Sequence, residues 1–173
     1  MRLATSGTGV IATTLARGAY PVEAVRTMAI IAREVERDYP HDVLRYRRIA
    51  QATRTIESSI AEAAAAMAEE LSLRAIVTGT TTGSTARLIS SFRPRANVVA
   101  MTPVPEVARR MALVWGVDAL VVEPYTYFES LIDVVEARML SEHRAVPGET
   151  IVVTSGMPVA EGGTNVLKVH RLP

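Results

Sequence analysis

The chain has 173 residues, of which 49% are hydrophobic and 21% are charged, and its net charge is +1 at pH 7. This length and balance are typical of one globular domain with its own core and exclude a disordered chain. The charge is not the concentrated basic excess of a nucleic-acid-binding protein, and the lack of cysteine excludes disulfides and thiolate sites. Because no apolar run approaches the ~20 residues that span a bilayer, we expect a cytoplasmic protein without a membrane or nucleic-acid partner.

The first half of the sequence predicts two amphipathic helices. Residues 21–39 open with a proline where a helix tolerates a missing N–H, and their apolar side chains recur on one face. Residues 55–72 contain four consecutive alanines, which favour a helix. The apolar stripe expected on this second helix consists of Ile56, Ile60, Ala63, Ala64, Met67 and Leu71.

From residue 74 onward, short apolar runs alternate with helical patterns. Strands are predicted at 75–77, 97–101 and 119–122, and helices at 84–92, 105–115 and 128–143, with Thr102 as a cap for the second of these. This alternation is typical of a parallel sheet covered on both faces. Two more strands are predicted at 150–156 and 165–172. The sequence therefore predicts a three-layer α/β/α sandwich whose five-stranded sheet is mostly parallel, with its last strand at an edge.

The loop after the first of these strands, "TGTTTGST", crowds hydroxyl groups in front of a helix. Ligands of open α/β sheets bind at the carboxyl ends of strands, and helix N-termini offer free N–H groups that suit a phosphate. Gly83 is expected to let the backbone approach such a ligand closely. The loop is neither a Walker A sequence nor G-x-G-x-x-G. The pattern alone leaves two interpretations open, a phosphate-binding loop and an ordinary threonine- and glycine-rich turn with a helix cap.

Three segments resemble the C-terminal domain of pyruvate kinase, and they occur in the family's order: "YPVEAVRTMAIIAREVE", "TGTTTGSTARLISSFRP" and "PGETIVVTSGMPVAEGGTNVLKVH". The resemblance covers residues 19–173, whereas residues 1–18 resemble nothing and are interpreted as a leader of unknown origin. It implies a non-catalytic regulatory domain of a glycolytic phosphotransferase, which binds a phosphorylated effector (a sugar phosphate or a nucleotide) and contributes to a homo-oligomer. The family's phosphoryl-transfer residues lie in a (β/α)8 barrel, to which nothing here corresponds. An excised domain and a free-standing relative both fit this pattern.

The resemblance also implies which residues hold the effector. The phosphate would lie on the hydroxyl-rich loop, a loop containing Glu161 and Gly162 would close over it, and an arginine of the helix at 128–143 would supply charge. The alternative for that arginine is a solvated charge on a helix face. Leu131 stands seven residues before it, where members that respond to fructose 1,6-bisphosphate have tryptophan, which favours a bacterial type of effector or none. The expected effector-binding residues are Thr80, Thr81, Thr82, Gly83, Ser84, Thr85, Arg138, Gly163 and Thr164.

No catalytic residue, metal site or cofactor is predicted. His41, His143 and His170 lie far apart in the sequence and near no carboxylate at metal-ligand spacing. Two other hypotheses stay open: a free-standing enzyme acting on a phosphorylated small molecule, and a structural oligomerisation domain with no ligand. The lack of acid–base residues near the loop argues against the first, and the density of hydroxyl groups in the loop argues against the second.

Overall fold

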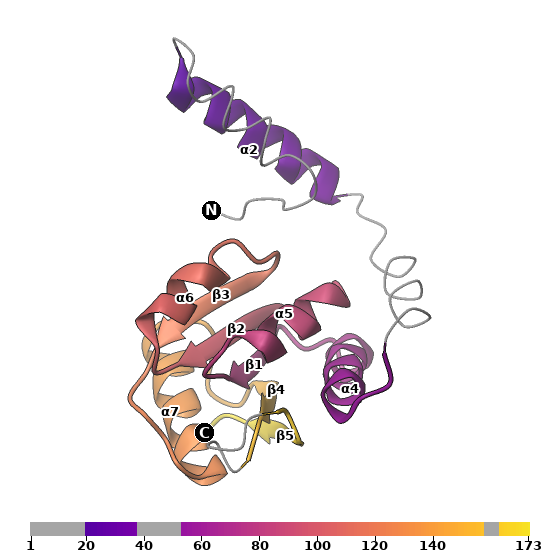
Figure 1. The fold of residues 1–173 in the computed structure, drawn as a ribbon, viewed down its shortest axis with the longest axis vertical. Coiled ribbons are helices and arrows are strands. Elements are labelled where there is room, and N and C mark those ends of the chain that lie inside the picture. The colour runs from indigo at the N-terminus through magenta and orange to yellow at the C-terminus, as the bar shows by residue number, and fades with distance from the viewer. Residues whose placement is uncertain (1–19, 38–52, 158–162) are drawn as a thin grey trace.

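A computed structural model describes residues 20–37, 53–157 and 163–173 of the chain (Figure 1). The helices are α2 (Pro21–Arg37), α4 (Ile56–Glu70), α5 (Ser84–Ser91), α6 (Pro105–Met111) and α7 (Phe128–Ser141). The strands are β1 (Ala75–Gly79), β2 (Asn97–Thr102), β3 (Val117–Val121), β4 (Thr150–Ser155) and β5 (Val166–Arg171). None of the helices in these described ranges is long and apolar enough to cross a membrane.

The five strands form one sheet in the order β3-β2-β1-β4-β5. The pairs β1–β2, β2–β3 and β1–β4 are parallel, and β5 runs antiparallel to β4 at the edge. The predicted mostly parallel sheet with its last strand at an edge is therefore confirmed. After β1 the chain adds β2 and β3 on one side, and it then returns to place β4 on the other side. The carboxyl ends of β1 and β4 therefore flank a switch point, where open α/β sheets bind ligands.

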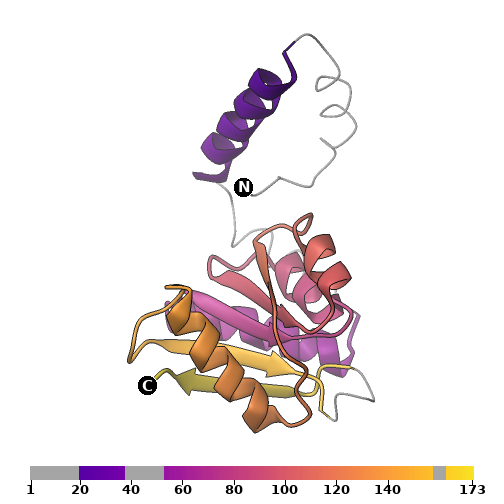
Figure 2. The ribbon, with the colours of Figure 1, turned by 90° about the vertical axis from the view of Figure 1, so that its left-hand side faces the viewer.

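Helices cover both faces of the sheet, which confirms the three-layer prediction. On one face, α4, α5 and α6 pack on a cluster that includes Ile76 and Val98. On the other face, α7 packs on a cluster that includes Val77 and Val99. Figure 2 shows α7 and α4 on opposite sides of the sheet. Since both faces are buried, β1 is buried along its whole length, as expected for a central parallel strand.

The stripe predicted for α4 is only partly confirmed: Ala64 is buried, and Met67 is partly buried against the same core cluster. Ile56 and Leu71 are 67% and 54% exposed. The helix instead buries a face of small residues, which are Ser58, Ala61, Ala64, Ala65 and Ala68. Alanine and serine let the helix axis approach the sheet and α5 closely, so the interface is set by the smallest side chains rather than by the most hydrophobic ones.

The predicted first helix is present as α2, and residues 38–39 of the prediction lie outside the described residues. No residue of α2 is buried, and Val22 and Val35 are each 62% exposed. One further expectation differs from the structure. Thr102 does not cap α6, because it is the last residue of β2 and the N-cap position is Val104. The chain needs two more residues to leave the sheet, and the Thr102 hydroxyl accepts a hydrogen bond from the backbone N–H of Val104 within that turn.

Candidate functional site

An open cavity of about 70 Å³ lies at the carboxyl ends of β1 and β4, beside the first turn of α5. A cavity of this size has room for several water molecules or for a small anionic group. Its described lining consists of hydroxyl-bearing residues and glycines, with no acidic or basic side chain among them. These residues are Gly79, Thr80, Thr81, Thr82, Ser84, Thr85, Tyr125, Ser155, Gly156 and Gly163.

The loop from β1 to α5 is shaped by its own hydroxyl groups. Thr80 is buried, and its Oγ1 accepts a 2.9 Å hydrogen bond from the backbone N–H of Gly83. Thr82 Oγ1 lies 2.9 Å from Ser84 Oγ and accepts a longer bond, 3.3 Å, from the backbone N–H of Ser84. Because the Thr80 hydroxyl acts as an acceptor in this bond, its own hydrogen remains available to be donated. A hydroxyl carries one donor and two acceptor positions, so this loop retains unused donors next to the cavity.

The first turn of α5 adds backbone donors. The first N–H groups of any helix have no partner within the helix. Here the N–H groups of Thr85 and Ala86 meet no acceptor in the described parts of the chain. The Thr85 hydroxyl is hydrogen-bonded to the hydroxyl of Thr164, which brings the segment before β5 against the loop although 79 residues separate the two. The cavity is therefore rich in donors for a group that only accepts hydrogen bonds.

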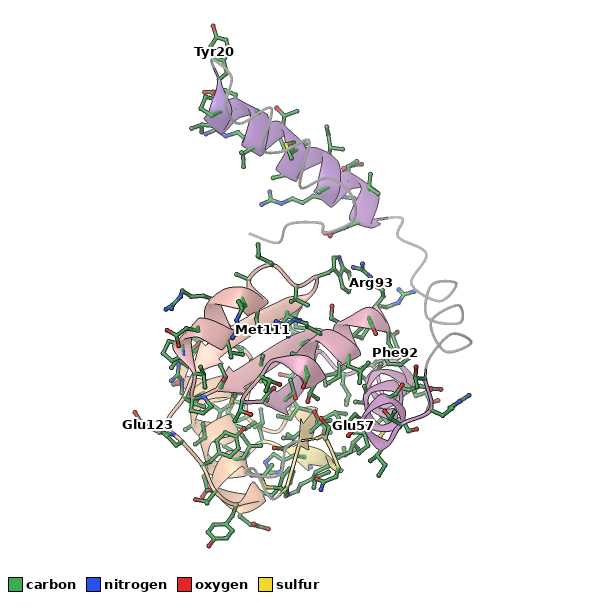
Figure 3. All side chains as sticks on the ribbon, in the orientation of Figure 1. Tyr20, Glu57, Phe92, Arg93, Met111 and Glu123 are labelled. Atoms are coloured by element: carbon green, nitrogen blue, oxygen red, sulfur yellow. The ribbon has the colours of Figure 1, made fainter. Side chains whose placement is uncertain are left out.

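Gly83 has a structural role that the sequence analysis did not predict. It adopts a positive φ of 80° at the N-cap of α5, a conformation that favours glycine. A Cβ added there would lie 2.5 Å from Cε of Met111, which Figure 3 shows on α6. The residue does not line the cavity. The glycine therefore serves the turn and the packing of α6, and its expected role near a ligand stays a prediction.

The sequence prediction missed four residues that line the cavity, which are Gly79, Tyr125, Ser155 and Gly156. Tyr125 is hydrogen-bonded to Ser155, and burial raises its pKa, against the smaller effect of that bond. A Cβ on Gly79 would lie only 2.4 Å from the Tyr125 hydroxyl oxygen, so the phenol occupies the space that this glycine leaves open. Ser155 is the last residue of β4, and Gly156 follows it. Their position at the end of a predicted strand was the sequence signal that could have identified them, because ligands bind at the carboxyl ends of strands. Nothing in the sequence pattern pointed to Tyr125.

Arg138 is not part of the described lining, whereas Gly163 of the predicted closing loop is. The Arg138 guanidinium pairs with the carboxylate of Glu142 and donates to the backbone carbonyl of Val121 at 3.1 Å. These contacts are compatible with a charge on the helix face, and the assignment of Arg138 to the effector stays a prediction. Gly163 lines the cavity and Thr164 lies directly behind it, whereas Glu161 and Gly162 lie outside the described residues.

The histidines give no sign of a metal centre in the part of the chain that is described. His170 Nε2 lies 2.8 Å from Glu136 Oε1, across the contact between β5 and α7. No group of three or more potential ligands occurs among the described residues. His41 lies outside them.

Comparisons with known proteins place this fold in a family. Residues 58–170 match the model described as "Pyruvate kinase, alpha/beta domain". The chain belongs to the pyruvate kinase α/β domain family. This result confirms the resemblance carried by the three sequence segments.

Individual relatives of the family agree with this assignment. Pyruvate kinases from Clostridium acetobutylicum and Geobacillus stearothermophilus are 37% and 36% identical over 156 residues, which is 90% of this chain. The chain covers 33% and 27% of those proteins. A crystal structure of a pyruvate kinase from Cryptosporidium parvum superposes with a TM-score of 0.80 at 29% identity, over 90% of this chain and 31% of that one. The chain thus spans about a third or less of the relatives that it matches.

Proposed function

We propose that this chain acts as a non-catalytic regulatory domain of pyruvate kinase type, and that the cavity binds the phosphoryl group of an effector. The effector is a sugar phosphate or a nucleotide, and the protein acts in glycolysis in the cytoplasm. The observation that supports this most is the lining itself: hydroxyl groups and unpaired helix N–H groups converge on a space with no described charged residue. Such donors suit an acceptor-only anion. They supply neither a metal ligand nor an acid–base pair for transferring the phosphate.

Ligand-induced stabilisation tests this proposal. A ligand that binds only the native state at 100 times its Kd raises the free energy of unfolding by about 2.7 kcal/mol. For a chain of this size the melting temperature then rises by roughly 5–11 °C. The panel consists of AMP, ribose 5-phosphate, glucose 6-phosphate and fructose 1,6-bisphosphate, with sulfate as the reference anion. If no member shifts the melting temperature beyond sulfate, the loop is an ordinary turn and the proposal fails.

Substitutions at Ser84 test whether the ligand binds in this cavity. It is exposed, lines the cavity and is the first residue of α5. Ser84→Asp places a carboxylate at a helix N-terminus, where it is compatible with the fold, but the charge competes with a bound phosphate. Ser84→Asn has nearly the same shape without the charge and serves as the matched control. We expect the ligand shift to vanish in Ser84→Asp and to persist in Ser84→Asn. Gly83→Asp is a poorer test, because it would also clash with Met111.

We also propose that the chain alone does not transfer phosphate from phosphoenolpyruvate to ADP. Phosphoryl transfer depends on metal ions that position and neutralise the phosphates, and the described residues offer no cluster to hold one. A lactate-dehydrogenase-coupled assay is expected to show the buffer rate. Turnover above that rate, reproduced with independently purified protein, would favour the free-standing enzyme instead.

Subunit assembly is the second part of the proposed function. β5 pairs with β4 on one side and is the last strand of the sheet, so its other edge pairs with no strand among the described residues. Val169 on this strand is 39% exposed. An antiparallel pairing of two β5 strands across a two-fold axis would satisfy both edges at once. Light scattering on the purified chain is expected to give at least twice 18.7 kDa, and a monomer mass at high concentration would contradict this.

A further inference from the structure

Strand β3 forms the second edge of the sheet, at the end opposite to β5 (Figure 1). In a parallel ladder, successive residues direct their backbone N–H and C=O groups to opposite sides of the strand. The carbonyl of Gly116 accepts a hydrogen bond from β2, and the N–H of Val122 donates one to β2, so the even-numbered residues face that strand. The residues whose backbone groups face away from β2 are therefore Val117, Ala119 and Val121. No strand among the described residues pairs with this side of β3.

The residues of β3 make this edge suitable for pairing with another strand. The strand contains two β-branched residues and one charged residue, Asp118. That charge is paired with Arg144, whose Nη1 lies 3.0 Å from Asp118 Oδ2, and Val121 is 44% exposed. Open edges of this kind add strands from other molecules unless a charged side chain, a bulge or a neighbouring element blocks them.

The side chain of Arg138, from the last turn of α7, lies at this edge. Its Nη1 donates a 3.1 Å hydrogen bond to the carbonyl oxygen of Val121, which is one of the outward-facing groups. Its Nε donates a 3.0 Å bond to Glu142 Oε1, and Glu142 also pairs with Arg144 at 3.2 Å. The hydrogen bond from Arg138 is the main cause that lowers the pKa of Glu142, so this carboxylate is ionised and holds the guanidinium in place. Charged contacts therefore run along β3 from Val121 back to Asp118.

We propose that Arg138 protects the β3 edge and prevents it from pairing with β3 of a second copy of the chain. A strand that approached this edge would have to displace the guanidinium from the Val121 carbonyl and from the ionised Glu142. The occupant is β3 of a second copy, because an antiparallel pairing about a two-fold axis uses the same residues on both sides.

The protection of β3 determines where assembly stops. This step rests on the proposed association through β5, in which each pair of copies presents two β3 edges, one at each end of the joined sheet. Pairing at those edges would join pairs end to end without closing, so assembly would continue into long chains of molecules. With Arg138 in place, assembly ends at the pair.

The substitution Arg138→Ala removes the protecting side chain and tests this inference. The ion pair with Glu142 is partly exposed, so the variant is expected to fold. The molecular mass of the full chain is measured by light scattering at increasing protein concentration. Arg54→Ala is the matched control, because Arg54 also pairs with a glutamate but precedes α4, which packs on the other face of the sheet from α7. Hydrogen exchange followed by mass spectrometry of the peptide 117–122 locates the new contact.

We expect the masses of the wild type and of Arg54→Ala to stay constant once the pair has formed. The mass of Arg138→Ala is expected to rise with concentration to at least twice that value, with slower exchange in peptide 117–122. An Arg138→Ala mass equal to that of the wild type, a rise shared by Arg54→Ala, or a rise without slower exchange in β3 would overturn this inference. A monomeric wild type, together with an Arg138→Ala variant that still associates through β3, would refute the association through β5 and leave this inference intact.

Discussion

Gly79→Ala probes the contact that forms the base of the cavity. The added methyl carbon would lie 2.4 Å from the Tyr125 hydroxyl oxygen, 2.8 Å from Leu131 Cδ2 and 3.1 Å from Ser155 Oγ. Ordinary contacts are longer, so the tyrosine must move by about 1 Å or more. Overpacking of this kind costs about 1–3 kcal/mol, and the lower chain entropy of alanine in the unfolded state offsets roughly 0.4–1 kcal/mol of that. We expect a net loss of about 1–2 kcal/mol and a melting temperature lower by about 2–8 °C.

A double-mutant cycle isolates this contact from other effects of the substitution. Tyr125→Phe removes the oxygen that the new methyl group meets and, alone, costs about 1 kcal/mol for the hydrogen bond to Ser155. Because the methyl group fills the space left by that oxygen, the double variant should lose about 1 kcal/mol less than the sum of the two single losses. Gly116→Ala is the control for coupling: its positive φ of 67° makes the substitution itself costly, but its Cβ would meet nothing within 4 Å, so the loss should simply add to that of Tyr125→Phe.

Urea unfolding followed by circular dichroism measures all of these free energies. The reasoning is refuted if Gly79→Ala is as stable as the wild type, or if its loss simply adds to that of Tyr125→Phe. Either result would mean that the phenol does not occupy the space over Gly79.

Three further predictions follow from buried and charged groups. Thr78 and Thr154 are fully buried on neighbouring strands, and their hydroxyl groups have no hydrogen-bond partner among the described residues. Thr154→Val should therefore leave the free energy of unfolding unchanged or raise it by up to about 1–2 kcal/mol. Thr85→Val breaks the bond to Thr164 and should lower the free energy of unfolding by about 1 kcal/mol. Burial raises the pKa of Tyr125 above its ordinary value of 10.0, so its contribution is complete below pH 10 and is lost as the pH rises through the folded-state pKa; in urea unfolding between pH 9 and 11, the wild type should lose stability more steeply than Tyr125→Phe, and parallel curves would contradict this. Arg138→Ala removes a partly exposed ion pair with Glu142 and should lower the free energy of unfolding by less than about 1 kcal/mol. Because Arg138 is not part of the described lining, the melting-temperature shift given by a phosphorylated ligand should stay the same. A halved shift would indicate that Arg138 contributes to ligand binding.

The order of elements and the sheet could be predicted because both depend on local patterns. Continuously apolar runs such as that of β1 indicate strands buried on both faces, and the alternation with helices indicates parallel pairing. The buried face of α4 could not be predicted in this way. An apolar stripe selects large side chains such as Ile56, but the distance between this helix and the sheet is set by alanines.

The candidate site also has one part that could be predicted from the sequence and one part that could not. The hydroxyl-rich loop is contiguous in sequence and precedes a helix, so its position at the end of β1 could be predicted. Tyr125 reaches the cavity from the connection between β3 and α7, and only the packing of the whole domain brings it there. The left-handed turn at Gly83 and its packing against Met111 could not be predicted either, because both depend on where α6 lies in the folded domain.

The most direct test of the central claim is to locate an anion on the loop itself. Inorganic phosphate is titrated into the ¹⁵N-labelled chain, and the backbone amide signals are followed by two-dimensional NMR. The account predicts saturable shifts centred on Ser84, Thr85 and Ala86, which are retained in Ser84→Asn and lost in Ser84→Asp. Shifts that are spread over the surface, do not saturate, or are the same in both variants would contradict a phosphate-binding site at the N-terminus of α5.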